Sequence, residues 1–149
     1  MMKITIVAIG KLKEKFLVEG VAEYFKRLRL FAKTEVREIP ECKTVSEEGK
    51  KLLAQIPKDS FVLVLDGSGT SLTSEDFAKK FFDLNLHGIN NITFIIGGAF
   101  GLSEEVRKFA DFRLSLSAMT FTHQMTRLIL LEQIYRAFKI NRGEPYHKI

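Results

Sequence analysis

The sequence predicts an α/β fold, with a mostly parallel sheet and helices on both of its faces. Short apolar, β-branched runs alternate with longer stretches whose apolar residues recur at helical spacing. The run at residues 94–96 stops at the glycine-rich residues 97–101, which is typical of a buried parallel strand that ends at a ligand. The length of 149 residues suits one domain, so we expect residues 1–149 to form it.

The first part of the chain predicts two units of strand and helix. Residues 3–9 have the pattern of a strand, and residues 15–29 place apolar side chains at helical spacing. Residues 34–39 alternate as a second strand does. The following helix is expected to begin after Thr44, which opens a capping box, and to end at Pro57.

A third unit begins with a wholly apolar strand at residues 61–65. Asp66-Gly67-Ser68-Gly69 follows and predicts a turn at residues 66–69. A helix is expected over residues 74–86.

The last part adds two strands and two helices. Strands are expected at residues 91–96 and 112–116, with a short helix between them that Ser103 caps. The longest helical pattern covers residues 123–141, and Gly143 follows as a stop.

This last helix is apolar over more of its surface than one sheet can cover. It is therefore either deeply buried within the monomer or part of a two-fold dimer interface. The second interpretation is favoured, because the final helix of a small domain rarely has protein on all sides.

Composition restricts the function classes. The longest apolar runs are far shorter than the roughly 20 residues of a membrane span, and the N-terminal run is unlike a signal peptide, so we expect a soluble, cytoplasmic protein without membrane contact. A single cysteine, Cys42, excludes an internal disulfide. The net charge of +5 favours a polyanionic partner.

Familiar cofactor and metal motifs are absent from the sequence. Residues 97–101 match neither the dinucleotide-binding nor the P-loop pattern. The three histidines, His87, His123 and His147, have no metal-ligand spacing, so no metal is expected. His123, at a helix start, suits a cap or a site equally well.

Three loops of small and polar residues follow neighbouring strands, at residues 65–69, 97–101 and 115–122. Glycines alone suit a tight turn without a ligand just as well. Three converging loops instead indicate a small-molecule pocket that offers backbone groups to a neutral ring.

Four segments together carry a family resemblance, and they lie at residues 96–102, 114–124, 131–140 and 145–148. In this order they resemble the RlmH family, the large-subunit ribosomal RNA pseudouridine N3-methyltransferases of the SPOUT superfamily. The similarity extends to residues 7–13, so it spans essentially the whole chain.

The resemblance implies a C-terminal trefoil knot, a homodimer through the knot region and the last helix, and S-adenosylmethionine held by loop backbone. Gly97 is expected to let the main chain approach this cofactor. The implied cofactor contacts are Leu65, Gly97, Leu116, Ser117, Ala118, Met119, Thr120 and Phe121.

The resemblance also implies a substrate, a pseudouridine in a stem-loop of large-subunit rRNA in the assembled ribosome. His147, next to Tyr146, is expected either to act as the base or to place the substrate ring. Arg142 and Lys148 are expected to bind phosphate. The secondary candidates are His123 and Arg127. The alternative function is a non-catalytic RNA-binding or ribosome-association module with the same fold.

Overall fold

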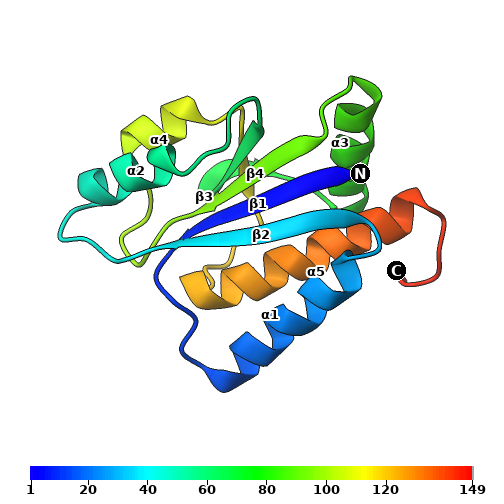
Figure 1. Ribbon diagram of the computed structural model, residues 1–149, viewed down its shortest axis with the longest axis horizontal. Coiled ribbons are helices and arrows are strands. Elements are labelled where there is room, and N and C mark those ends of the chain that lie inside the picture. Colours follow the sequence, from blue (N-terminus) through cyan, green and yellow to red (C-terminus); the bar gives the residue numbers. More distant parts are fainter. Residues whose placement is uncertain (149) are drawn as a thin grey trace.

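A five-stranded, all-parallel sheet lies between two layers of helices in the computed structural model, which describes residues 1–148 (Figure 1). The strand order is β2-β1-β4-β3-β5. The strands are β1 (Met2–Ile9), β2 (Ala32–Ile39), β3 (Phe61–Ser71), β4 (Asn91–Ile96) and β5 (Phe112–Ser115). The helices are α1 (Lys15–Leu28), α2 (Val45–Ala54), α3 (Ser74–Leu86), α4 (Glu104–Phe109) and α5 (His123–Asn141).

Each face of the sheet has its own core. Alternate residues of β1 point to opposite faces, so Ile6 packs with α1, α3 and α5, whereas Val7 packs with α2 and α4. Both side chains are fully buried. This burial on both faces explains why β1 and β4 are almost continuously apolar, and it confirms the predicted fold class.

Most element boundaries agree with the sequence to within a few residues. The ranges of α3, β4 and α5 match the predicted ones. The predicted caps are also present, because Thr44 Oγ1 accepts the Glu47 N–H at 3.1 Å and Ser103 Oγ accepts the Val106 N–H at 3.2 Å.

The predicted turn at residues 66–69 is wrong, because β3 continues as extended chain to Ser71. Its pairing with β5 is interrupted there: Leu65 and Thr70 both face Leu114, so the intervening residues bulge out of the ladder. A Cβ atom on Gly69 would lie 2.6 Å from the Arg113 carbonyl oxygen. Gly69 therefore permits β3 to approach β5 closely, and it does not reverse the direction of the chain.

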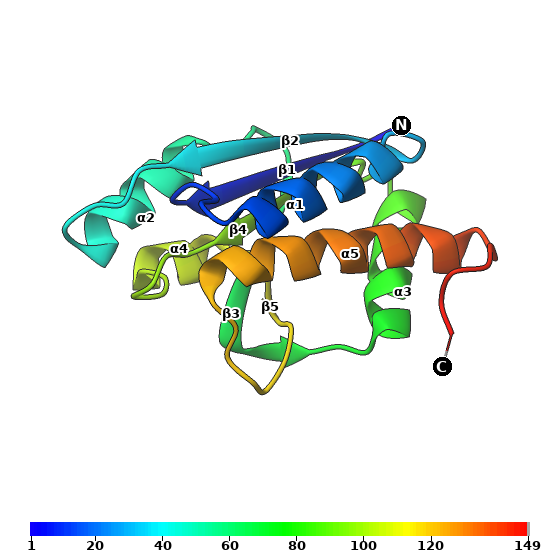
Figure 2. The same cartoon turned by 90° about the horizontal axis from the view of Figure 1, so that it is seen from below.

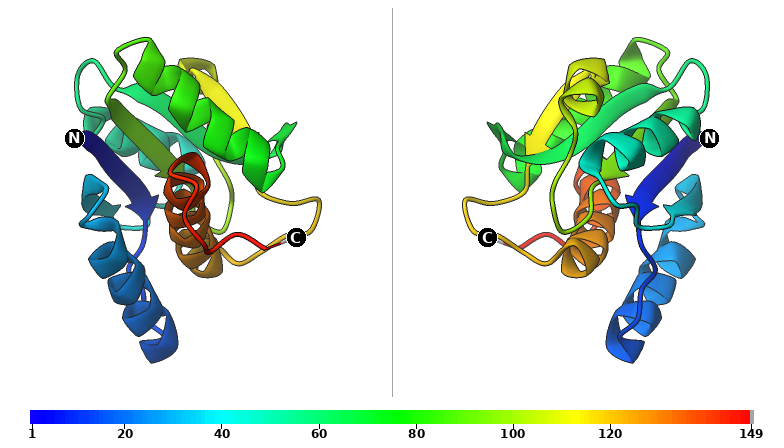
Figure 3. Two further views of the ribbon diagram at one scale, coloured as in Figure 1. Left: turned by 90° about the vertical axis from the view of Figure 1, so that its right-hand side faces the viewer. Right: turned by 90° about the vertical axis from the view of Figure 1, so that its left-hand side faces the viewer.

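Helix α5 lies between α1 and α3 and contacts both (Figures 2 and 3). Every residue from position 123 to position 140 is buried or half-buried. Aromatic contacts link it to both neighbours, with Tyr135 against Tyr24 of α1 and Phe138 against Phe81 of α3. The neighbouring helices thus account for much of its apolar character within one chain, and the dimer interface stays a prediction.

No helix among residues 1–148 combines the length and the apolar character that a membrane crossing requires.

Candidate cofactor cleft and C-terminal tail

Residues 65–67 of β3 and the loops after β4 and β5 meet at the carboxyl edge of the sheet and enclose a cleft of about 880 Å³. Ligands of open α/β sheets bind at this edge. All eight cofactor residues expected from the resemblance line the cleft: Leu65, Gly97, Leu116, Ser117, Ala118, Met119, Thr120 and Phe121. The volume is in the range of small-molecule sites.

The glycine loop after β4 is folded tightly on itself. The Gly101 N–H donates to the Gly98 carbonyl at 3.1 Å, and a Cβ atom on Gly97 would lie 2.8 Å from the Gly101 carbonyl oxygen. A Cβ atom on Gly98 would lie 3.0 Å from Ile9 Cγ2. The backbone of the loop therefore leaves no room for a side chain at Gly97, whether or not a ligand approaches it, and a side chain at Gly98 would press on Ile9 of β1.

The loop after β5 is held by its own hydroxyl groups. Ser115 Oγ donates to the Ser117 carbonyl at 3.1 Å, and Ser117 Oγ accepts the Met119 N–H at 3.0 Å. This turn leaves Met119 77% exposed at the cleft. The part of the cleft wall that follows β5 is thus a hydrogen-bonded turn that presents an apolar side chain.

Asp66 and Arg107 line the same cleft and did not figure among the expected site residues. Arg107 Nε donates to Asp66 Oδ2 at 3.1 Å, and Arg113 Nη1 lies 3.4 Å from the same oxygen. Burial raises the pKa of Asp66, but hydrogen bonds from the Ser68 N–H and hydroxyl and the charges of the two arginines outweigh it, so the pKa is lowered. The only feature of the sequence that could have indicated Asp66 was its position, as a single carboxylate directly after the apolar residues 61–65.

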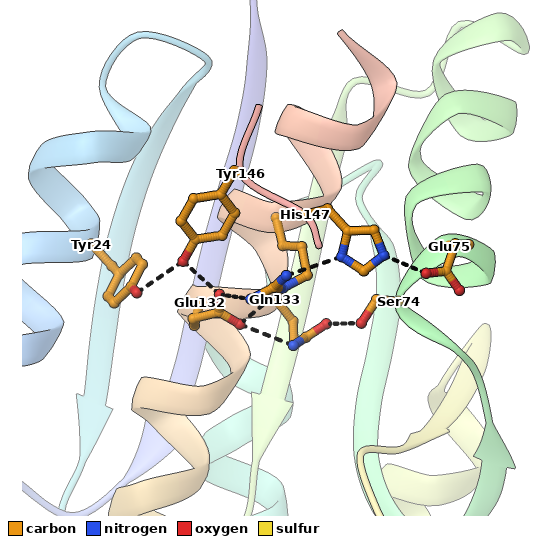
Figure 4. A network of polar contacts seen from close by, with 8 residues as sticks. Tyr24, Ser74, Glu75, Glu132, Gln133, Tyr146 and His147 are labelled. Carbon is orange, nitrogen blue, oxygen red and sulfur yellow. Dashed lines mark hydrogen bonds and ion pairs between the residues drawn. The ribbon is translucent and has the colours of Figure 1, made fainter. Parts of the chain in front are cut away.

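Tyr146 and His147 lie in the C-terminal tail, which folds back on α5 (Figure 4), whereas Arg142 is the C-cap of α5. Tyr146 donates its hydroxyl hydrogen to Glu132 Oε2 at 2.6 Å, and its oxygen lies 3.1 Å from the Tyr24 hydroxyl. His147 contacts Arg136 through Nδ1 and Glu75 through Nε2. Arg142 is 59% exposed at its side chain and pairs with Glu144.

The environment of Tyr146 opposes its ionisation. Burial raises the pKa of its hydroxyl, and the hydrogen bonds with Glu132 and Tyr24 raise it further. In this arrangement Tyr146 is a hydrogen-bond donor, and it cannot serve as a phenolate base near neutral pH.

The tail and the cleft are separate in one chain: among residues 1–148, those that line the cleft do not include Arg142, Tyr146 or His147. The secondary candidates divide in the same way. His123 lines the cleft, and its buried Nε2 has no hydrogen-bond partner among residues 1–148. Arg127 is 2% exposed and binds Glu38 and the Gly10 carbonyl, which gives it a structural role.

The described residues, 1–148, contain no group of histidine, cysteine, aspartate and glutamate side chains that could hold a metal ion.

A family model described as "Predicted SPOUT methyltransferase" matches residues 2–147. The chain belongs to the SPOUT methyltransferase family. Proteins named "Ribosomal RNA large subunit methyltransferase H" are similar to it over 99% of this chain and 100% of their own length. The identity is 54% for Carboxydothermus hydrogenoformans, 51% for Clostridioides difficile and 50% for Halothermothrix orenii. The resemblance to the RlmH branch of the SPOUT family is thereby confirmed.

Solved structures agree in fold. A probable methylase family protein from Haemophilus influenzae has a TM-score of 0.59 at 14% identity, covering 98% of this chain and 70% of that one. The SpoU methyltransferase AviRb from Streptomyces viridochromogenes has a TM-score of 0.50 at 12% identity, covering 95% of this chain and 61% of its own. The chain thus matches about three fifths of the length of AviRb.

Proposed function

We propose that this chain is an S-adenosylmethionine-dependent methyltransferase that modifies N3 of a pseudouridine in large-subunit rRNA of the assembled ribosome. The full-length similarity to ribosomal RNA large subunit methyltransferases H supports the reaction class. The convergence of residues 65–67 of β3 and the loops after β4 and β5 on one cleft of about 880 Å³ is the structural observation that supports it most.

The cleft suits a cofactor with a neutral ring and an apolar edge. The glycine loop and residues 116–121 offer backbone N–H and C=O groups, while Leu65 and Leu116 are half-buried apolar walls. S-adenosylmethionine, when bound there, supplies a methyl group already activated by the adjacent sulfonium charge.

The chemistry required of the protein is orientation and hydrogen bonding. In the proposed transfer the methyl carbon would become bonded to N3 while its bond to sulfur breaks, the sulfur would keep the electron pair and leave as S-adenosylhomocysteine, and N3 would give its proton to water. Alignment of the two reactants in one site removes much of the entropic barrier of such a transfer. Side chains next to the substrate ring have to stabilise the charge that forms on the ring as N3 loses its proton.

We also propose a homodimer, formed through a knotted C-terminal region and α5, in which the tail of one protomer reaches the cleft of its partner. The separation of tail and cleft within one chain supports this arrangement. Apolar side chains near the cleft support it too, because Phe100 is 81% exposed and Met119 77% exposed.

The surface charge suits an RNA substrate. Lys11, Lys13 and Lys15 are exposed near the start of α1, and Arg142 and Lys148 are exposed at the tail. Cationic side chains in two regions could follow the phosphates of a stem-loop. Assembled ribosomes in the cytoplasm would then be the site of action.

Two measurements test the proposal. Calorimetry of the full chain should detect S-adenosylmethionine, and Met119→Glu should weaken binding at least tenfold, because it places a carboxylate at the cleft. Phe82→Glu is the matched control, since Phe82 is an exposed apolar residue of α3 outside the cleft lining. The absence of binding at millimolar cofactor would refute the enzyme function.

Methylation is measured on assembled ribosomes and on isolated large subunits, with the modified nucleoside identified by mass spectrometry. N3-methylpseudouridine formed from assembled ribosomes is the expected product. A protein that binds rRNA but forms no methylated nucleoside would instead be the non-catalytic RNA-binding module.

A further inference from the structure

The tail is fixed on α5 by a network of polar side chains in which Arg136 occupies the central position. Its Nη2 donates to Glu132 Oε2 at 2.8 Å, and its Nε lies 3.4 Å from Glu132 Oε1. The guanidinium carbon also lies 4.9 Å from the centre of the Tyr146 ring. Arg136 and Glu132 are only 22% and 21% exposed at their side chains, so Arg136 is held from two sides.

Glu132 orders a second part of the same network. Besides Arg136, it accepts the Tyr146 hydroxyl at 2.6 Å and the Gln133 side-chain amide at 2.9 Å. Gln133 in turn accepts the Ser74 hydroxyl at 2.7 Å, so α5, α3 and the tail are joined (Figure 4). One carboxylate therefore fixes both Tyr146 and the arginine that faces His147.

The protonation of His147 follows from what its partners can do. A guanidinium has N–H donors only, so His147 Nδ1, 3.0 Å from Arg136 Nη1, has to be an acceptor without a proton. The ring proton then lies on Nε2, which faces Glu75. A hydrogen bond from His147 lowers the pKa of Glu75, which keeps this carboxyl group ionised and able to accept.

We propose that Arg136, held by Glu132, is a positioning residue that fixes His147 as the neutral tautomer protonated on Nε2, so that His147 donates a hydrogen bond to the substrate. This inference rests on the proposed function and resolves one of its open alternatives. A general base needs a free ring nitrogen, whereas here Nδ1 faces a permanent cation and Nε2 already carries the proton.

Glu75 occupies the position that we assign to the hydrogen-bond acceptor of the substrate. Its side chain is 51% exposed in the first turn of α3, so another acceptor can replace it as the partner of the neutral His147 ring. An oxygen of the substrate can take its place without disturbing Arg136. The imide N3 lies between two carbonyl groups that gain negative charge as its proton leaves, and a donor placed there stabilises that charge.

Nitrogen-resolved NMR of the histidine side chains tests the tautomer without any substrate. In the full chain free of cofactor and RNA, we expect His147 to show a protonated Nε2 and an unprotonated Nδ1 at neutral pH. A His147→Asn sample assigns the signal. Arg136→Met should give a mixture of tautomers, whereas Lys79→Met, at an exposed site of α3, should change nothing. A protonated Nδ1 in the wild-type chain would overturn the inference.

Substitutions of His147 test the role in methyl transfer. Glutamine places an amide N–H donor close to the position of Nε2 but cannot act as a base, so His147→Gln should lose no more than about tenfold in kcat. His147→Ala should lose about 100-fold to 1,000-fold, the usual effect of deleting one donor to a developing oxyanion. Equal losses for both variants would overturn the inference.

The remaining outcomes separate the inference from the proposed function. A loss that appears only in KM, with a changed salt dependence, would identify the acceptor as an RNA phosphate and would refute the carbonyl contact. If the wild-type chain methylates no RNA at all, the proposed function fails and the substrate contact with it, while the NMR result still decides the tautomer.

Discussion

Replacement of Gly97 by alanine tests the packing of the glycine loop. The new Cβ atom would lie 2.8 Å from the Gly101 carbonyl oxygen and 3.0 Å from Leu102 Cδ2. Because the nearest atom belongs to the backbone, the loop has to open by about 0.6 Å to restore ordinary van der Waals contact. Overpacking of this kind costs about 1–3 kcal/mol.

The assay combines thermal unfolding with calorimetry. For a domain of this size 1 kcal/mol corresponds to roughly 2–4 °C, so Gly97→Ala should lower Tm by roughly 2–12 °C. The displaced loop should also weaken S-adenosylmethionine binding at least tenfold, which is about 1.4 kcal/mol.

Gly67→Ala is the matched control, because Gly67 also lines the cleft but a Cβ atom there meets nothing within 4 Å. It should leave Tm essentially unchanged. If Gly97→Ala and Gly67→Ala have the same Tm and the same affinity for S-adenosylmethionine, the close packing at Gly97 has no effect and the prediction is refuted. A loss of cofactor affinity at position 97 without any loss of stability would show that the collision is with the ligand and not with the loop.

Three further predictions concern ion pairs and the tail. Glu38→Gln should reduce the free energy of unfolding in urea by about 3 kcal/mol, because it leaves the buried Arg127 without its carboxylate. Arg127→Met should cost less, since the 34% exposed Glu38 side chain can turn to water. The lowered pKa of Asp66 stabilises the fold above its unfolded pKa of about 3.9, so this contribution should disappear as pH falls through the folded value, and the stability difference between wild type and Asp66→Asn should shrink below about pH 4. A chain that ends at Pro145 should stay dimeric in sedimentation experiments, since the interface is assigned to α5, while its methylation of ribosomes is lost.

The sequence predicted elements well where apolar spacing decides the structure. The ranges of α3 and α5 were correct because their burial repeats at the helical period. The turn at residues 66–69 was wrong because glycine has two uses that sequence alone does not distinguish. Gly69 allows close approach to β5, which depends on the position of Arg113, a residue 44 positions further along the chain.

Only part of the site could be predicted from the sequence. Most of the cleft residues lie at or just after the ends of strands, and a parallel sheet brings these ends together at one edge. The contacts of the tail are set by tertiary structure: Tyr146 reaches Tyr24, 122 positions away, and His147 reaches Glu75, 72 positions away. No local pattern encodes such partners, so the network around Arg136 could be found only from the structure.

The strand order has a consequence for how this protein folds as it is synthesised. β4 lies between β1 and β3, although both of these leave the ribosome before it does. Until residues 91–96 emerge, β1 has one unpaired edge and β3 has no neighbour at all. Exposed apolar edges of this kind invite association with other chains. The nascent chain is therefore prone to association until β4 pairs with β1 and β3. Sheets assembled from segments so distant in sequence also form slowly.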